Sequence, residues 1–144
     1  MMKQAAYQFA TEIDVLLSEG YRIWEDFGFP VPDQEEKHKI AYCAVDSCEN
    51  GKFAKEYAAA CQCFYLFRKL HCMTECEPEK ATLLGDYFFS RFSHYLIPID
   101  STRLIDLFSE YLKKDVKDVV KSSADFCTDA YMDFIRSTAK EIGL

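Results

Sequence analysis

Apolar side chains recur every three or four residues along most of the chain, the spacing of one buried helix face. The pattern predicts a first helix that ends at Gly28 and the Phe29-Pro30-Val31-Pro32 stretch. Its expected buried face carries Phe9, Ile13, Leu16, Gly20, Ile23 or Trp24, and Phe27. Asp33 and Glu36 have the spacing of a capping box, so a second, weaker helix is predicted from there to about Cys48.

Two stronger helical patterns follow a predicted turn at Asn50-Gly51. The first runs from Lys52 to near Cys76, and its expected buried side carries Phe53, Tyr57, Ala60, Cys61, Phe64, Phe67, Arg68 and His71. The second begins at Pro78, because the missing N–H of a proline would be unpaired in a first helical turn anyway. It extends to Pro98, with Ala81, Leu84, Phe88, Phe92 and Tyr95 as its buried stripe.

Two more helices complete the pattern. Asp100 or Ser101 is expected to cap a helix whose stripe is Leu104, Ile105, Phe108, Leu112, Val116 and Val119. After Ser122-Ser123 a last helix is predicted through Cys127, Ala130, Tyr131, Phe134 and Ile135 towards Gly143. The sequence shows no strand alternation and no internal repeat. It therefore predicts an all-α, single-domain antiparallel bundle of about six helices over residues 1–144.

Composition narrows the class of protein. Twelve Phe, nine Tyr and 49% hydrophobic residues in 144 supply one core. The net charge of -7 argues against a nucleic-acid partner, because phosphates would be repelled. No apolar run reaches the roughly twenty residues of a membrane helix, and no signal peptide is visible, so we expect a soluble, cytoplasmic protein. Seven cysteines within helical patterns indicate free thiols in a reducing compartment.

The stretch from Ala81 to Phe92 is the most distinctive part of the chain. Its Gly85-Asp86-Tyr87-Phe88-Phe89-Ser90-Arg91 resembles the G-D-F/Y-x-x-S/T-R segment of the long-chain trans-prenyl diphosphate synthases, which join isopentenyl diphosphate to an allylic diphosphate. The resemblance implies a truncated terpenoid-synthase-like fold. In that family the segment follows the motif H-D-D-x-x-D, whose carboxylates hold Mg²⁺ against the allylic diphosphate. The corresponding position here reads His71-Cys72-Met73-Thr74-Glu75-Cys76.

The chain departs from the family wherever diphosphate or metal is handled. Cys72, Met73 and Cys76 replace the metal-binding acids, and sulfur ligands cannot serve Mg²⁺, which requires hard oxygens. The loop before Gly85 is shorter than in catalytic members and lacks their arginine pair, and no G-K-R signature precedes Lys39. The 131–139 segment resembles the family's Y-x-x-x-I-x-x-K-T-A helix without its lysine, and the sequence stops at Leu144 before a second aspartate-rich motif.

These losses lead us to expect a non-catalytic small subunit of a heteromeric prenyl diphosphate synthase, resembling component 1 of the heptaprenyl or hexaprenyl enzymes. Its expected partner is a catalytic subunit that carries all the Mg²⁺, or a second copy when the chain is alone. No catalytic residue and no metal ligand is assigned. The candidates for a partner interface or a prenyl cavity are Asp86, Tyr87, Phe88, Phe89, Arg91, Phe92 and Tyr95. Core packing is the simpler explanation for the rings, and both roles can hold for different rings.

Two alternatives compete with the subunit hypothesis. One is a stand-alone helical protein that binds a prenyl chain or another apolar ligand in a closed pocket. The other is a metal or redox sensor built on Cys72 and Cys76, which lie one helical turn apart but lack a second pair at zinc spacing. A hydrolase is not indicated, because His38 and His94 have no acid and nucleophile nearby in the sequence.

Overall fold

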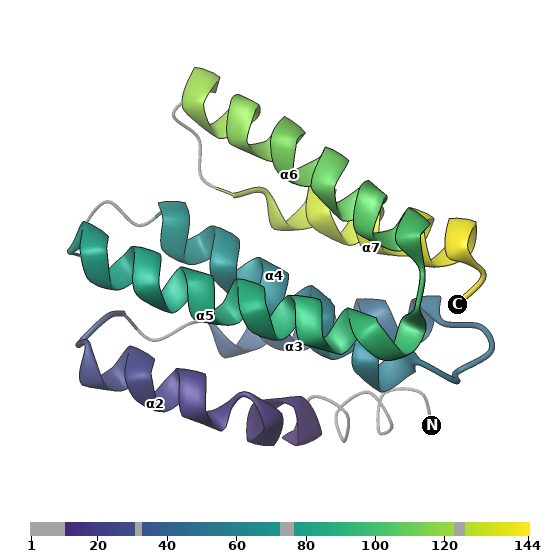
Figure 1. Cartoon of the computed structure of the whole chain (residues 1–144), viewed down its shortest axis with the longest axis horizontal. Coiled ribbons are helices and arrows are strands. Elements are labelled where there is room, and N and C mark those ends of the chain that lie inside the picture. The colour runs from purple at the N-terminus through teal and green to yellow at the C-terminus, as the bar shows by residue number, and fades with distance from the viewer. Residues whose placement is uncertain (1–10, 31–32, 73–76, 123–125) are drawn as a thin grey trace.

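Each of the six predicted segments forms a helix in the computed structural model, which describes residues 11–30, 33–72, 77–122 and 126–144. Within those ranges the fold is all-α, without strands (Figure 1). The elements are α2 (Ser18–Asp26), α3 (Gln34–Ser47), α4 (Ala54–Cys72), α5 (Pro78–Leu96), a 3-10 turn η1 (Ile97–Ile99), α6 (Thr102–Ser122) and α7 (Thr128–Ile142). Residues 11–16 are also helical and precede α2. No helix in the described ranges has both the length and the apolar character needed to cross a bilayer.

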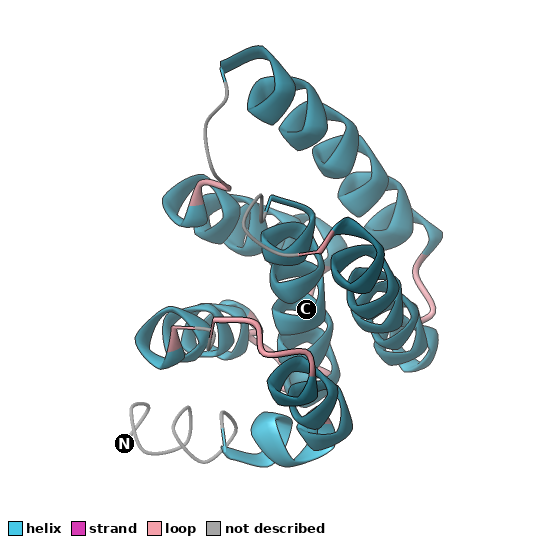
Figure 2. Ribbon diagram, turned by 90° about the vertical axis from the view of Figure 1, so that its left-hand side faces the viewer, coloured by secondary structure: helices cyan, strands magenta, loops and turns pink. Residues whose placement is uncertain are grey.

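The central helix of the bundle is α4. Every side chain from Tyr57 to Arg68 is buried, so α4 is covered on all sides, whereas its sequence pattern predicted a single buried side. His71, predicted on that buried side, is exposed because it lies in the last turn of the helix. It packs mainly against α5 and α3, α7 packs against α3, and α2 packs against α5. Figure 2 shows the helices gathered around this centre. Because α4 is buried on all sides, the helices on either side of it pack against a common surface.

Local side chains set where the helices begin and turn. Asp33 Oδ1 accepts hydrogen bonds from the backbone N–H groups of Glu35 (3.0 Å) and Glu36 (3.3 Å), which confirms the predicted N-cap. Ser101 rather than Asp100 caps α6, because Ser101 Oγ accepts from Leu104 N at 3.1 Å. The predicted turn at Gly51 is also present, with a φ of +70° that favours glycine.

The partner predicted for the capping box is used elsewhere. The Glu36 carboxylate accepts hydrogen bonds from the Tyr65 hydroxyl at 2.6 Å and from the Thr128 hydroxyl. It therefore ties α3 to α4 and to the start of α7 instead of closing the box around Asp33. A contact between segments so distant in the chain competes successfully with the local one.

Two predicted buried faces are wrong by one residue. In the first helical segment Leu17 is fully buried and Leu16 is 38% exposed. The buried positions Ile13, Leu17, Gly20 and Trp24 are spaced by four, three and four residues, which places Leu17 rather than Leu16 on the buried face. In α6 the buried position is Asp115, whereas Val116 is 40% exposed. Asp115 turns inward because its carboxylate contacts Arg68 of α4 at 2.7 Å. Ile105, also predicted to be inside, is exposed, and the Val119 side chain lies outside the described residues.

Candidate functional site

The segment that resembles prenyl diphosphate synthases lies on α5, packed along α4. The predicted stripe of α5 is confirmed, since Ala81, Leu84, Phe88, Phe92 and Tyr95 are all buried. Gly85 allows α5 to approach the end of α4 closely, because a Cβ atom at this position would lie 2.7 Å from Nε2 of His71. Gly85 therefore lies directly against His71, the first residue of the 71–76 segment that was compared with the aspartate-rich motif.

His71 and Cys72 form the last turn of α4, whereas Met73 and Cys76 lie outside the described residues. The His71 ring meets the Phe67 ring edge-on, with 4.4 Å between their centroids. Partial burial lowers the pKa of His71, the charge of Arg68 lowers it further, and Asp86 opposes both. His71 is therefore held in its neutral form. In the described ranges no three His, Cys, Asp or Glu side chains come close enough together to hold a metal ion.

One cation close to this turn, Arg68, is already neutralised. Arg68 Nε donates to Asp115 Oδ2 at 2.7 Å, and the two side chains are only 5% and 9% exposed. A buried arginine that is paired in this way is not free to grip a diphosphate. The described end of α4 thus carries an imidazole, a half-buried thiol, Lys69 and a compensated ion pair, and it lacks the carboxylate oxygens that Mg²⁺ requires.

Three of the rings proposed for a partner interface belong to the core. The Phe88 ring lies 6.0 Å from that of Trp24 on α2, and the Phe92 ring lies 4.9 Å from that of Phe108 on α6. The Tyr95 hydroxyl accepts a hydrogen bond from Arg91 Nη2 at 3.0 Å. Packing between helices therefore accounts for Phe88, Phe92 and Tyr95, and the Arg91 guanidinium is engaged within its own helix.

The remaining candidates lie nearer the surface. Asp86 is exposed, and Tyr87 and Arg91 are half-buried. The Phe89 side chain is 37% exposed and rests on Phe67, with 4.9 Å between ring centroids. Phe89 and Asp86 are thus the candidates that a partner could reach most readily.

Sequence reasoning missed most of the surface of α5 that faces away from the core. We call it the outer stripe, and it consists of Leu83, Asp86, Ser90, Ser93 and His94 together with Ile97, which follows α5 directly and begins η1, all exposed. Leu83 and Ile97 are 65% and 71% exposed, which is high for side chains of their size. Asp86 is the only member that is charged at neutral pH. Exposed apolar residues with few charges are typical of the centre of a protein interface. The seven-residue spacing of Leu83, Ser90 and Ile97 could have revealed the stripe.

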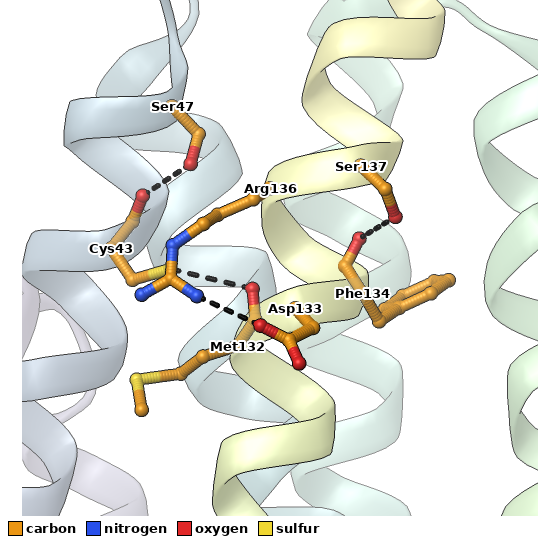
Figure 3. A network of polar contacts seen from close by, with 7 residues as sticks. All are labelled: Cys43, Ser47, Met132, Asp133, Phe134, Arg136 and Ser137. Atoms are coloured by element: carbon orange, nitrogen blue, oxygen red, sulfur yellow. Dashed lines mark hydrogen bonds and ion pairs between the residues drawn. The ribbon is translucent and has the colours of Figure 1, made fainter.

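A depression of about 380 Å³ lies between the ends of α3 and α7, and it carries charges of both signs. Its lining includes Asp46, Glu49, Arg136 and Lys140. Figure 3 shows Arg136 beside Cys43, with its Nη1 donating to Asp133 at 3.1 Å. The two helix C-termini add partial negative charge. The two acids offset the two bases, so the depression has no excess of positive charge that would attract a diphosphate.

A second depression, of about 470 Å³, adjoins the first turn of α5. The described residues that line it are Pro78, Glu79, Thr82 and Leu83. None of these four is basic, and Glu79 is acidic. This surface also lacks the cations that a diphosphate needs.

A buried polar cluster joins the N-terminal segment to α3 and α4. Lys37 is 1% exposed, and burial lowers its pKa. Its Nζ lies 3.6 Å from Asp14 Oδ1 and 4.0 Å from the centroid of the Tyr21 ring. The Tyr21 hydroxyl accepts from Gln62 Nε2 at 2.9 Å. The analysis of the sequence missed Lys37, although it lies three residues before Ile40 on the buried face of α3. The cluster links the N-terminal segment to α3 and α4.

No family model, curated protein or solved structure matches this chain. In the described part of the chain, no group of three His, Cys, Asp or Glu side chains could hold a metal ion. Packing does not account for the exposed apolar side chains of the outer stripe, nor for Val15 (69% exposed) and Ile105 (51%) on other helices.

Proposed function

We propose that this protein is a non-catalytic small subunit of a heteromeric long-chain prenyl diphosphate synthase. In this proposal the chain packs on a catalytic subunit through the outer stripe of α5 and influences the length of the product. The catalytic subunit supplies the Mg²⁺ and all diphosphate chemistry. The proposal rests on the resemblance of the α5 segment and on the surface that this segment presents.

The observation that carries the proposal is the exposure of Leu83 and Ile97 at the two ends of the outer stripe. Each leaves most of an aliphatic side chain in water, and burial of such a side chain is worth about 1.5 to 3 kcal/mol. When a partner covers the stripe, Asp86 is the carboxylate that would lose its hydrating water. A partner with an apolar helix face would therefore gain more from Leu83 and Ile97 than it loses at Asp86.

An influence on chain length would require an apolar surface beside the growing prenyl chain. The Phe67 and Phe89 rings provide one at the junction of α4 and α5, where Phe89 remains partly exposed. In a complex, these rings would close one end of the cavity that holds the growing prenyl chain and so limit its length. Larger or smaller side chains at Phe89 would then shift the distribution of products.

The test is co-expression of the chain with the long-chain prenyl synthase of the same host, followed by co-purification and a product assay. We expect a stable complex, prenyl transfer only when both chains are present, and no elongation by this chain alone at any Mg²⁺ concentration. Turnover by the isolated chain would exclude the non-catalytic role.

Two exposed isoleucines provide a matched pair of variants. Ile97→Glu places a charge on the outer stripe and should abolish co-purification, because a charge at a desolvated interface centre is costly. Ile105→Glu makes the same change on α6 and should leave the complex intact. If both variants bind the catalytic subunit equally well, the outer stripe is not the binding surface.

A further inference from the structure

The depression between the ends of α3 and α7 has a charged lining that the proposed function does not use. Its volume of about 380 Å³ is within the roughly 300 to 1,000 Å³ of small-molecule pockets. Asp46 lines it from the end of α3 and Glu49 from the loop that follows, whereas Arg136 and Lys140 line it from α7. The acids therefore come from one side of the depression and the bases from the other.

These opposite charges do not neutralise each other across the depression. In the part of the chain that the structure describes, no ion pair of 4.0 Å or less joins either acid to either base. Arg136, which Figure 3 shows reaching from α7 towards α3, is paired with Asp133 of its own helix at 3.1 Å, and both side chains are exposed. Because so exposed a pair contributes little free energy, Arg136 can exchange Asp133 for the carboxylate of a ligand.

The neutral polar groups of the lining already have partners within the protein. Asn50 Nδ2 donates to Gly143 O at 3.0 Å, and Leu144 O accepts from Asn50 N at 2.9 Å. Ser47 Oγ donates to Cys43 O at 2.6 Å. The contacts of Asn50 fix the end of α7 against the loop after α3, so the depression is formed before any ligand binds. The charged side chains are the part of the lining with which a ligand can pair.

We infer that this depression binds an aliphatic zwitterion whose ammonium and carboxylate groups are separated by several methylene groups. The ammonium group donates hydrogen bonds to the carboxylates of Asp46 and Glu49, beside the negative end of the α3 dipole. The carboxylate accepts hydrogen bonds from Arg136 and Lys140. The two charges of the ligand have to be well separated, because the acids and bases that bind them are themselves more than 4.0 Å apart.

The lining favours a spacer made of methylene groups and selects against a single charge. Ala139 and Leu144 contribute apolar surface to the depression, so the spacer can lie against them. An anion alone would be repelled by the two acids and by the C-terminal ends of α3 and α7, whereas a cation alone would be repelled by the two bases. A zwitterion that lies across the depression keeps each of its charges beside side chains of the opposite sign.

The first test is a ¹H–¹⁵N NMR titration of the purified full chain with 6-aminohexanoate, whose two charges are separated by a chain of methylene groups. The charged side chains of the lining are all exposed, so each contact is weak and we expect a dissociation constant of roughly 1 mM. The shifts should be saturable and centred on the amides of Asn50, Gly143 and Leu144, which line the depression. No saturable shift up to about 50 mM would overturn the inference.

Hexylamine and hexanoate carry a similar chain with only one of the two charges, and they serve as the ligand controls. At equal ionic strength each should bind at least about tenfold more weakly than 6-aminohexanoate. Glycine, whose two charged groups share one carbon, should also bind more weakly. If either singly charged compound binds as tightly as 6-aminohexanoate, attraction to a single charge explains the shifts and the inference is wrong.

A matched pair of charge reversals tests the basic side of the depression. Lys140→Glu should raise the dissociation constant of 6-aminohexanoate at least about fivefold, because an attraction becomes a repulsion. Lys113→Glu makes the same change at an exposed lysine of α6, outside the lining, and should leave the dissociation constant unchanged. Both lysines are exposed, so both variants should keep the circular dichroism spectrum of the unsubstituted chain. Equal effects of the two variants on binding would show that the ligand does not lie in the depression.

The zwitterion site and the proposed function can be tested separately. None of the residues that line the depression belongs to the outer stripe, and the titrations contain no catalytic subunit. Failure of the titrations therefore leaves the proposed function standing, and failure of co-purification leaves the zwitterion site standing.

Discussion

Two glycines mark positions where helices touch through their backbones, and their surroundings differ. A Cβ atom on Gly20 would lie 2.7 Å from Cζ of Phe88, and one on Gly85 would lie 2.7 Å from Nε2 of His71. Phe88 is fully buried, so it cannot move aside, whereas His71 is exposed and can swing outwards. The same close distance should therefore have different consequences at the two positions.

We expect Gly20→Ala to lower the free energy of unfolding by about 2 kcal/mol, as overpacking of a filled core does. Gly85→Ala should change it by less than about 0.5 kcal/mol, because the small rearrangement of His71 is offset by the better helix propensity of alanine. Urea denaturation followed by circular dichroism measures both. Equal losses in the two variants would contradict this account of the α2–α5 and α4–α5 contacts.

The buried Lys37 gives a second prediction at the scale of single residues. The Lys37 side chain is 2% exposed, whereas that of its counter-ion Asp14 is 32% exposed. Removing the acid leaves a buried cation without compensation, so Asp14→Ala should cost about 3 kcal/mol. Removing the base leaves a carboxylate whose Oδ1 is buried but whose side chain is still one-third exposed, so Lys37→Met should cost less than Asp14→Ala, about 1 kcal/mol. Thermal or urea unfolding that ranks the two variants in the opposite order would be inconsistent with the geometry of the pair.

At the scale of helices, the Arg68–Asp115 pair is the buried polar contact that joins α4 to α6. We expect Asp115→Ala to destabilise the fold by about 3 to 5 kcal/mol, since Arg68 would remain buried and charged. Replacing both residues, as Arg68→Met with Asp115→Leu, should recover most of that loss because two apolar side chains can fill the same space. A double-mutant cycle in urea gives the coupling energy. Additive effects of the two single substitutions would show that the pair does not couple α4 to α6.

At the scale of the whole molecule, the cysteines described in the structure are free, and several are buried in one core. Burial raises the pKa of Cys48 to about 11 and raises the pKa values of Cys61 and Cys63 further still. The folded state therefore keeps these thiols protonated, whereas the unfolded chain loses their protons near pH 8.5. Buried Tyr57 and Tyr131 also have raised pKa values and extend the same effect to higher pH.

The sign of the pH dependence follows from this difference. The contribution of the thiols is fully present below about pH 8.5 and is lost as pH rises further, because the unfolded state then binds fewer protons than the folded state. At pH 9.5 we expect a loss of about 3 kcal/mol from the three thiols together, at roughly 1 kcal/mol each. Lys37, with its lowered pKa, acts in the opposite direction but is a single group. Urea unfolding at pH 7.5 and 9.5 under reducing conditions measures the loss, and Cys48→Ala should reduce it.

Helix positions could be predicted from the sequence because their determinants are local. Each determinant acts within a few residues of the helix that it defines. Examples are the caps at Asp33 and Ser101, the turn at Gly51, and the spacing of Ala81, Leu84 and Phe88. The all-α class and the approximate ends of the helices follow from such features. The resemblance of the α5 segment to prenyl synthases could likewise be found in the sequence alone.

The surface available for binding was decided only by the tertiary structure. Whether Phe88, Phe89 or Phe92 reaches solvent depends on which helices lie against α5, and the pattern of α5 by itself cannot specify them. Contacts between distant segments also overrode local spacing, since Arg68 drew Asp115 into the core in place of Val116 and Glu36 bound Tyr65 and Thr128 instead of closing a capping box. Periodicity determines that a helix has a buried face, whereas the partners of that face determine which residues on either side of it remain exposed.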